Sequence, residues 1–155
     1  MMRSLKLALL LTGLYGMLGL ASLARAEDNA AVAAMAEYLE FVDYGGATIF
    51  PEQIPADDWK SIFVIDARDA GQYAQEHIPG AVNIEWRQVL ARRQELPKDK
   101  SILIYCNTGT LSAQAGFALR VAGMDNVRIL QGGFSAWKAK GGFDAYRRAT
   151  QPVKE

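Results

Sequence analysis

Short apolar runs alternate along this chain with segments of mixed polarity. Residues 62–65, 101–105 and 127–130 are almost free of polar side chains. An apolar run of this length is typical of a strand that is covered on both faces, as in a parallel sheet. Residues 48–50 and 81–84 are predicted to form two further short strands, and residues 101–105 are expected to be the central one.

Helices are predicted between these strands because apolar residues recur there at helical spacing and glycines mark the ends. The predicted helices are residues 70–75, 85–95, 111–122 and a segment that carries Trp137. Strands that alternate with helices indicate an α/β fold, here a three-layer α/β/α sandwich with a mainly parallel, roughly five-stranded sheet. The chain beyond Phe143 is expected to be loosely held.

The first 26 residues have the pattern of an export signal. Arg3 and Lys6 precede residues 7–20, which carry no charge, and Ala24-Arg25-Ala26 resembles a signal-peptidase site. The apolar run is shorter than the roughly 20 residues that span a bilayer. We therefore expect cleavage and a periplasmic location, with an uncleaved membrane anchor as the alternative.

The chain is accordingly divided into four parts. An amphipathic helix is predicted at residues 29–44, with Val32, Met35, Leu39 and Val42 as its large apolar residues. The four parts are a signal at residues 1–26, a helical extension at residues 27–46, a single domain at residues 47–145 and a tail at residues 146–155.

Charge excludes some classes of partner. The chain carries 17 basic and 17 acidic residues, which gives no sign of nucleic-acid binding. Arg3, Lys6 and Arg25 all lie in the predicted signal, so its removal would leave the remainder mildly acidic. We expect no attraction to anionic membrane surfaces after cleavage.

Cys106 is the single cysteine of the chain, so it cannot form an internal disulfide. It follows an apolar strand and precedes a helix, where backbone N–H groups and the helix dipole favour an anion. A buried core cysteine is the alternative, but the position at the end of a strand favours an accessible, reactive thiol. Carboxyl ends of strands are also where ligands bind in such folds.

The loop after the cysteine can surround a charged sulfur with backbone N–H groups, and Gly109 allows a backbone conformation that other residues resist. The hydroxyls of Thr108, Thr110 and Ser112 are candidates either for substrate contact or for capping the helix that follows.

Three segments resemble the signatures of rhodanese domains. They are VIDARDAGQYAQEHIPGAVNI at residues 64–84, YCNTGTLS at residues 105–112 and VRILQGGFSAW at residues 127–137. The resemblance extends over roughly residues 48–143 and leaves the N-terminal helix outside. It implies a sulfurtransferase that carries sulfur as a persulfide on Cys106.

The resemblance also implies the reaction partners. Thiosulfate or a related compound would be the sulfur donor and cyanide or a thiol the acceptor, with a persulfide-carrying protein as another possible partner and no metal or organic cofactor. The residues expected to bind substrate are Asn107, Thr108, Gly109, Thr110, Leu111, Ser112 and Arg87.

Leu111 departs from the family pattern, because many single-domain rhodaneses carry arginine at this loop position. Either another basic residue binds the donor anion, with Arg87 the first candidate and Arg92 the second, or thiosulfate is not the natural donor. An exposed helix face is the plainer interpretation of both arginines.

Other residues of the signatures are interpreted as structural. Asp66 and Arg68 are expected to form an ion pair or brace a turn, and His77 to structure a turn rather than act as a base. Gly132 and Gly133 are expected to allow close backbone approach near the site, and Trp137 to lie in the core.

The residues of the same loop also bear on other functions of this fold. Related phosphatases carry arginine six residues after the cysteine, where this chain has Ser112, so phosphate would lack its bidentate clamp. An arsenate reductase would need a resolving thiol, which a lone cysteine does not supply. A module that docks an envelope protein remains an alternative, because Leu111 weakens the expected anion site.

Overall fold

In the computed structural model, residues 30–150 are described. The chain divides into two compact units, Met1–Phe41 and Val42–Glu155. In the first unit residues 30–41 form a helix, which confirms the central part of the predicted helix, and three of its apolar side chains, those of Val32, Met35 and Leu39, are exposed. The predicted signal lies outside the described residues.

The second unit is built on five parallel strands in the order β1-β5-β4-β2-β3, which confirms the predicted α/β fold. The central strand is the apolar one before the cysteine, as predicted, and all four of its residues are buried. The strands are β1 Thr48–Ile49, β2 Phe63–Asp66, β3 Val82–Asn83, β4 Ile102–Tyr105 and β5 Val127–Leu130.

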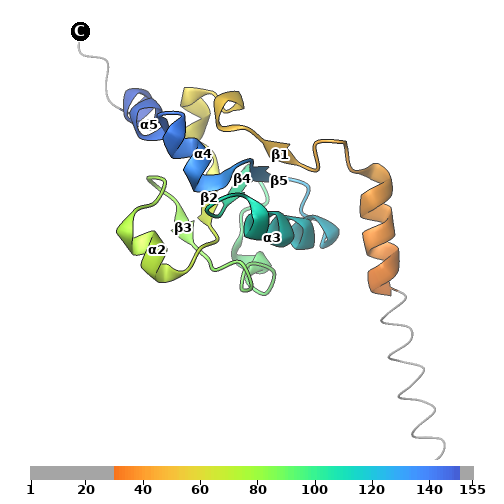
Figure 1. The fold of residues 1–155 in the computed structure, drawn as a ribbon. Coiled ribbons are helices and arrows are strands. Elements are labelled where there is room, and N and C mark those ends of the chain that lie inside the picture. The colour runs from red at the N-terminus through yellow and green to blue at the C-terminus, as the bar shows by residue number, and fades with distance from the viewer. Residues whose placement is uncertain (1–29, 151–155) are drawn as a thin grey trace, which may run out of the picture. The chain divides into compact units, whose positions relative to one another are not determined.

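Helices cover both faces of this sheet, as Figure 1 shows with α3 on one side and α4 and α5 on the other. The α-helices are α2 Ala70–Gln75, α3 Thr110–Val121, α4 Gly133–Ala139 and α5 Gly142–Thr150. Three short 3-10 helices complete the unit: η1 Pro51–Gln53, η2 Ala56–Lys60 and η3 Arg93–Glu95.

Two apolar clusters form because alternate strand residues point to opposite faces. On one face Ile104 packs with Leu119 of α3. On the other face Tyr105 packs with Phe134 and Trp137 of α4, which confirms Trp137 as a core residue. The sheet is therefore buried on both sides, and Cys106 follows β4 at its carboxyl edge.

The predicted helix at residues 85–95 is wrong. This segment consists of turns and ends in η3, with hydrogen bonds such as Gln88 N–H to Glu85 O and Glu95 N–H to Arg92 O that span three residues. In residues 85–95 only Val89 is buried. Because one buried residue makes no apolar stripe, local propensity for a helix has no packing to support it.

The prediction of a loosely held chain beyond Phe143 is also wrong for residues 144–150. They belong to α5, and Phe143 and Tyr146 pack against the cluster around Trp137. The centroids of the Phe143 and Trp137 rings lie 4.7 Å apart. The sequence shows Phe143 and Tyr146 as aromatic residues, but it does not show that they pack against the cluster around Trp137.

Candidate active site

Cys106 follows β4 directly, and the loop after it curls around the sulfur. The Gly109 N–H lies 3.2 Å from Sγ and the Ser112 hydroxyl 3.5 Å from it. Gly109 has a φ of 102° and is the N-cap of α3, which confirms its predicted unusual conformation. The loop therefore brings two donors to the sulfur from a glycine turn and a helix start.

The expectation of an exposed thiol is wrong, since Cys106 is only 3% exposed. The loop contributes to this burial through the Gly109 N–H and the Ser112 hydroxyl, which lie beside the sulfur. Cys106 nevertheless lines a cavity of about 320 Å³, so this buried residue borders space that a small molecule can enter.

Burial of the thiol raises the pKa of Cys106, because a charged sulfur loses hydration. Hydrogen bonds from the Ser112 hydroxyl and from loop amides act in the opposite direction and prevail, so this pKa lies below that of an ordinary thiol. The amides are those of Ser112, Thr108 and Gly109. The site therefore favours the thiolate, as the sequence predicted.

The Ser112 hydroxyl has two acceptors within reach for its one proton. Its oxygen lies 3.0 Å from Gly109 O and 3.5 Å from Cys106 Sγ. A neutral thiol leaves the proton free for the carbonyl, whereas a thiolate draws it toward the sulfur. Ser112 is fully buried, so its hydroxyl serves the sulfur rather than solvent.

Capping of α3 by a loop hydroxyl, one of the two alternatives, is not found, because the N-cap is Gly109, which has no side chain to accept from the first N–H groups. Thr108 and Thr110 instead place their hydroxyl oxygens 3.4 Å apart. Thr108 lines the cavity, while Thr110 opens α3 and lies outside the lining.

The loop is clamped from α4. The Phe134 and Ser135 N–H groups donate to the carbonyls of Cys106 and Asn107, at 2.8 and 3.0 Å. A Cβ on Gly133 would lie 2.3 Å from the Cys106 carbonyl oxygen. This confirms for Gly133 the predicted close approach of the backbone to the site, whereas a Cβ on Gly132 would meet Ala136 of α4 instead.

Asp66 and Arg68 form the predicted structural ion pair. Arg68 Nη2 lies 2.6 Å from Asp66 Oδ2, and both side chains are buried. Tyr105 also donates to Asp66 at 2.7 Å. A buried pair with further hydrogen bonds holds the end of β2 beside the end of β4.

The same arginine reaches the cavity. Arg68 Nη1 lies 3.4 Å from Asn107 Oδ1, and Asn107 Nδ2 donates to Gln72 Oε1 at 2.9 Å. Arg68, Gln72 and Asn107 all line the space beside Cys106. A second hollow shares these three residues and extends toward Phe134.

Arg87 lines the cysteine cavity, as predicted, whereas Arg92 pairs with Glu95 outside it. Arg87 is not held for the donor alone, because its Nε lies 2.9 Å from Glu85 Oε1. Leu111 also lines the cavity, so the loop position that carries arginine in many relatives presents an apolar side chain here.

Sequence reasoning missed several lining residues that follow neighbouring strands. They are Ala67, Asp69, Gln72, Glu85 and Trp86. The sequence contains an indication of these residues, because residues 67–69 follow β2, residues 84–87 follow β3, and the carboxyl ends of parallel strands meet at one edge of a sheet. The order of the strands in the sheet is needed to identify them, and the sequence does not give that order.

His77 takes no part in this cavity. Its Nδ1 donates to the Tyr73 carbonyl at 2.8 Å, and its ring stacks on the Tyr73 ring at a centroid distance of 4.0 Å. The prediction of a structural turn histidine is confirmed.

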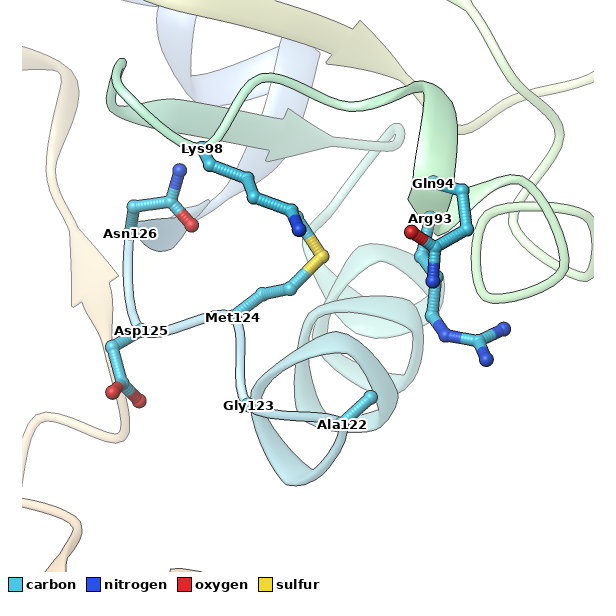
Figure 2. A pocket seen from close by; sticks show the side chains of 8 residues that line it. All are labelled: Arg93, Gln94, Lys98, Ala122, Gly123, Met124, Asp125 and Asn126. Carbon is cyan, nitrogen blue, oxygen red and sulfur yellow. The ribbon is translucent and has the colours of Figure 1, made fainter.

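A second cavity, of about 420 Å³, lies at the other end of β4. Figure 2 shows Lys98 and Met124 reaching into it from opposite sides. It lies at the start of β4 and the end of α3 and contains no cysteine. Across residues 30–150 there is no cluster of three metal-binding side chains and no helix long and apolar enough to cross a bilayer.

Residues 50–140 match the Rhodanese-like domain family. This chain belongs to the rhodanese-like domain family. It is 34% identical over 84 residues to a sulfurtransferase of Allochromatium vinosum, a match that covers 54% of this chain and 78% of that protein. A thiosulfate sulfurtransferase, GlpE, of Coxiella burnetii is 32% identical over 80 residues, covering 52% and 75%.

A solved structure agrees with the fold. The rhodanese-like domain of an Anabaena protein aligns with a TM-score of 0.55 at 28% identity, covering 61% of this chain and 75% of that one. The relatives support a sulfurtransferase of the rhodanese family as the general function of this protein.

Proposed function

We propose that this protein moves sulfane sulfur from thiosulfate or a related donor to cyanide or a thiol, through a persulfide on Cys106. The observation that carries the proposal is the position of Cys106, whose sulfur has the Gly109 N–H and the Ser112 hydroxyl as donors and which lines a cavity. Donors placed in this way stabilise a thiolate before the reaction and a persulfide anion after it.

The chemistry needs two displacements. The Cys106 thiolate attacks the outer sulfur of thiosulfate, the S–S bond of the donor breaks, and sulfite leaves with the bonding electron pair. The acceptor then attacks the outer sulfur of the Cys106 persulfide, and the thiolate is released. Because each half-reaction returns one product, we expect ping-pong kinetics.

Side chains around the cavity have separate roles in this proposal. Asn107 and Thr108 contact the donor from the loop, and Arg87 lies where the departing sulfite carries its charge. Arg87 is 72% exposed and pairs with Glu85 at the surface, an interaction weak enough for the side chain to turn toward a ligand.

Mass spectrometry of the purified protein after thiosulfate treatment tests the proposal. We expect a gain of one sulfur atom on the peptide that contains Cys106, and its loss on addition of cyanide with formation of thiocyanate. Cys106→Ser is the control and should gain no sulfur. A wild-type thiol that stays unmodified by every sulfane donor would contradict the proposal and favour a docking module.

We also propose that residues 1–26 direct export to the periplasm. The charged start, the uncharged run and the small residues before position 27 support this assignment. The amino-terminal sequence of the protein recovered from a periplasmic fraction is expected to begin at Glu27. Recovery of the full chain in the membrane fraction would indicate the uncleaved anchor instead.

A further inference from the structure

The cationic side chains that line the cysteine cavity are both engaged by carboxylates. Arg68 is paired with the buried Asp66 through two nitrogens, Nε and Nη2. Arg87 is paired with Glu85 through Nε, and the Glu85 carboxylate also accepts from the Arg87 backbone N–H at 3.0 Å. Neither positive charge is therefore left uncompensated beside Cys106.

A third carboxylate, that of Asp69, lines the same cavity and caps α2 by accepting from Gln72 N–H at 2.9 Å. Asp66 is not among the lining residues, so the lining itself holds two arginines and the two carboxylates of Asp69 and Glu85 and has no net positive charge. Thiosulfate is a dianion that must approach a thiolate, so a cavity without net positive charge repels it more than it would repel a monoanion.

One wall of the cavity is apolar. Leu111, in the first turn of α3, is 37% exposed and faces the space in which the donor must lie. Trp86 also lines the cavity, and the Arg87 guanidinium carbon lies 5.9 Å from the centroid of its indole ring. A cavity lined by an exposed leucine and a tryptophan favours a ligand that covers them with apolar surface.

We infer that the donor fitted by this cavity is a small organic sulfane-sulfur compound with one negative charge and an apolar substituent, such as a thiosulfonate, rather than thiosulfate. The inference rests on the proposed function and names its substrate class. The substituent lies against Leu111 and Trp86, and the sulfonyl oxygens face Arg87.

The step balances without any further reactant. The Cys106 thiolate attacks the terminal sulfur of the thiosulfonate, the S–S bond breaks, and a sulfinate leaves with the bonding electron pair. The protein retains one sulfur as a persulfide anion. The acceptor then removes that sulfur as in the proposed reaction.

Three donors separate the effects of charge and of apolar surface: thiosulfate, methanethiosulfonate and benzenethiosulfonate. Cyanide is the acceptor for each, thiocyanate is measured, and Cys106→Ser gives the background. Each kcat/KM is divided by the rate constant of the donor with cyanide alone, so that intrinsic reactivity cancels. We expect this normalised kcat/KM to be about tenfold higher for benzenethiosulfonate than for methanethiosulfonate, as for other apolar contacts in enzyme pockets.

Two variants of Leu111 test the wall directly. Leu111→Ala should lower the ratio of kcat/KM for benzenethiosulfonate to kcat/KM for thiosulfate by about tenfold, because the apolar contact is lost for the first donor only. Leu111→Arg should raise kcat/KM for thiosulfate and lower kcat/KM for benzenethiosulfonate, which shifts the preference toward thiosulfate. The matched control is Leu90→Arg, which adds the same charge at another exposed leucine outside the cavity lining. It should leave kcat/KM unchanged for every donor.

The inference is overturned if the two thiosulfonates react equally well, or if Leu111→Arg and Leu90→Arg change all donors alike. In either case the proposed function stands as long as one donor loads sulfur onto Cys106. If no donor does so, the proposed function fails, and that outcome is distinguished by the mass of the protein rather than by a ratio of rates.

Discussion

The two cavities at opposite ends of β4 differ in what surrounds them. The larger one, shown in Figure 2, is lined by exposed polar side chains such as Arg93, Gln94 and Lys98. The smaller one is built around the buried Cys106 and the buried Arg68. The cysteine end of this sheet is therefore distinguished by its buried polar groups with defined partners.

The difference also concerns how each end is held. The sulfur loop is fixed by α4 through the Phe134 N–H and by the ion pair that follows β2. The turn at the other end is closed by Gly123, where added atoms would meet open space. We therefore expect equivalent substitutions at the two ends to have unequal effects.

The largest difference is expected between two arginines. Arg68→Ala leaves Asp66 charged and buried without its partner, which typically costs about 3–5 kcal/mol of unfolding free energy. Arg93→Ala, at the exposed second cavity, should change the unfolding free energy by less than about 0.5 kcal/mol. Urea unfolding of both variants measures the contrast. Similar losses would show that the buried pair is not special.

A smaller difference is expected between two glycines with positive φ. Gly133→Ala adds a methyl group 2.3 Å from the Cys106 carbonyl oxygen, whereas at Gly123 no atom lies within 4 Å. We expect Gly133→Ala to lose about 2–3 kcal/mol more unfolding free energy than Gly123→Ala, since both bear the backbone strain and one adds a collision. Equal stability of the two variants would refute the close approach at Gly133.

Ser112→Ala tests the chemistry of the cysteine end. The Ser112 hydroxyl helps to hold the pKa of Cys106 below its ordinary value, so its removal should move this pKa upward. The rate of persulfide formation rises with pH through the pKa of the thiol, and the rise should therefore shift to higher pH in the variant.

The matched control for this change is Ser135→Ala, because Ser135 meets the loop through its backbone N–H. Its pH profile should coincide with that of the wild type. A Ser112→Ala profile that also coincides would remove the hydroxyl from the stabilisation of the thiolate.

The smallest effect is expected at the exposed Arg87. Arg87→Ala should raise KM for thiosulfate roughly two- to fivefold with little change in kcat, because an exposed ion contact is worth about 0.2–1 kcal/mol. Lys98→Ala, at the second cavity, removes the same charge and should leave KM unaltered. Equal KM values for the wild type and Arg87→Ala would exclude Arg87 from donor binding.

Much of the fold could be predicted because apolar runs report burial directly. The four apolar residues before Cys106 identified the central strand, and the glycine after them identified the loop. The helix predicted at residues 85–95 is absent because the charged residues there favour a helix locally, but a single buried residue gives that helix no apolar face to pack. The local sequence cannot show whether helix propensity or packing prevails.

Less of the site could be predicted. The loop that touches the sulfur is continuous in sequence, so its donors were found, but the walls come from three separate strands. Trp86 and Gln72 join the site only through the order of β3, β2 and β4. The burial of the thiol could not be predicted either, because it depends on how tightly the loop curls around Cys106, which the sequence does not show.

The contact between the sulfur loop and α4 has a consequence for the making of the protein. Phe134 and Ser135, which hold the carbonyls of Cys106 and Asn107, come late in the chain. A ribosome therefore releases the cysteine before it releases the residues that fix the loop around it. Newly made chains pass through a stage in which α4 does not yet hold this loop, and a loop that is not held exposes the thiol to oxidants more than the finished fold does.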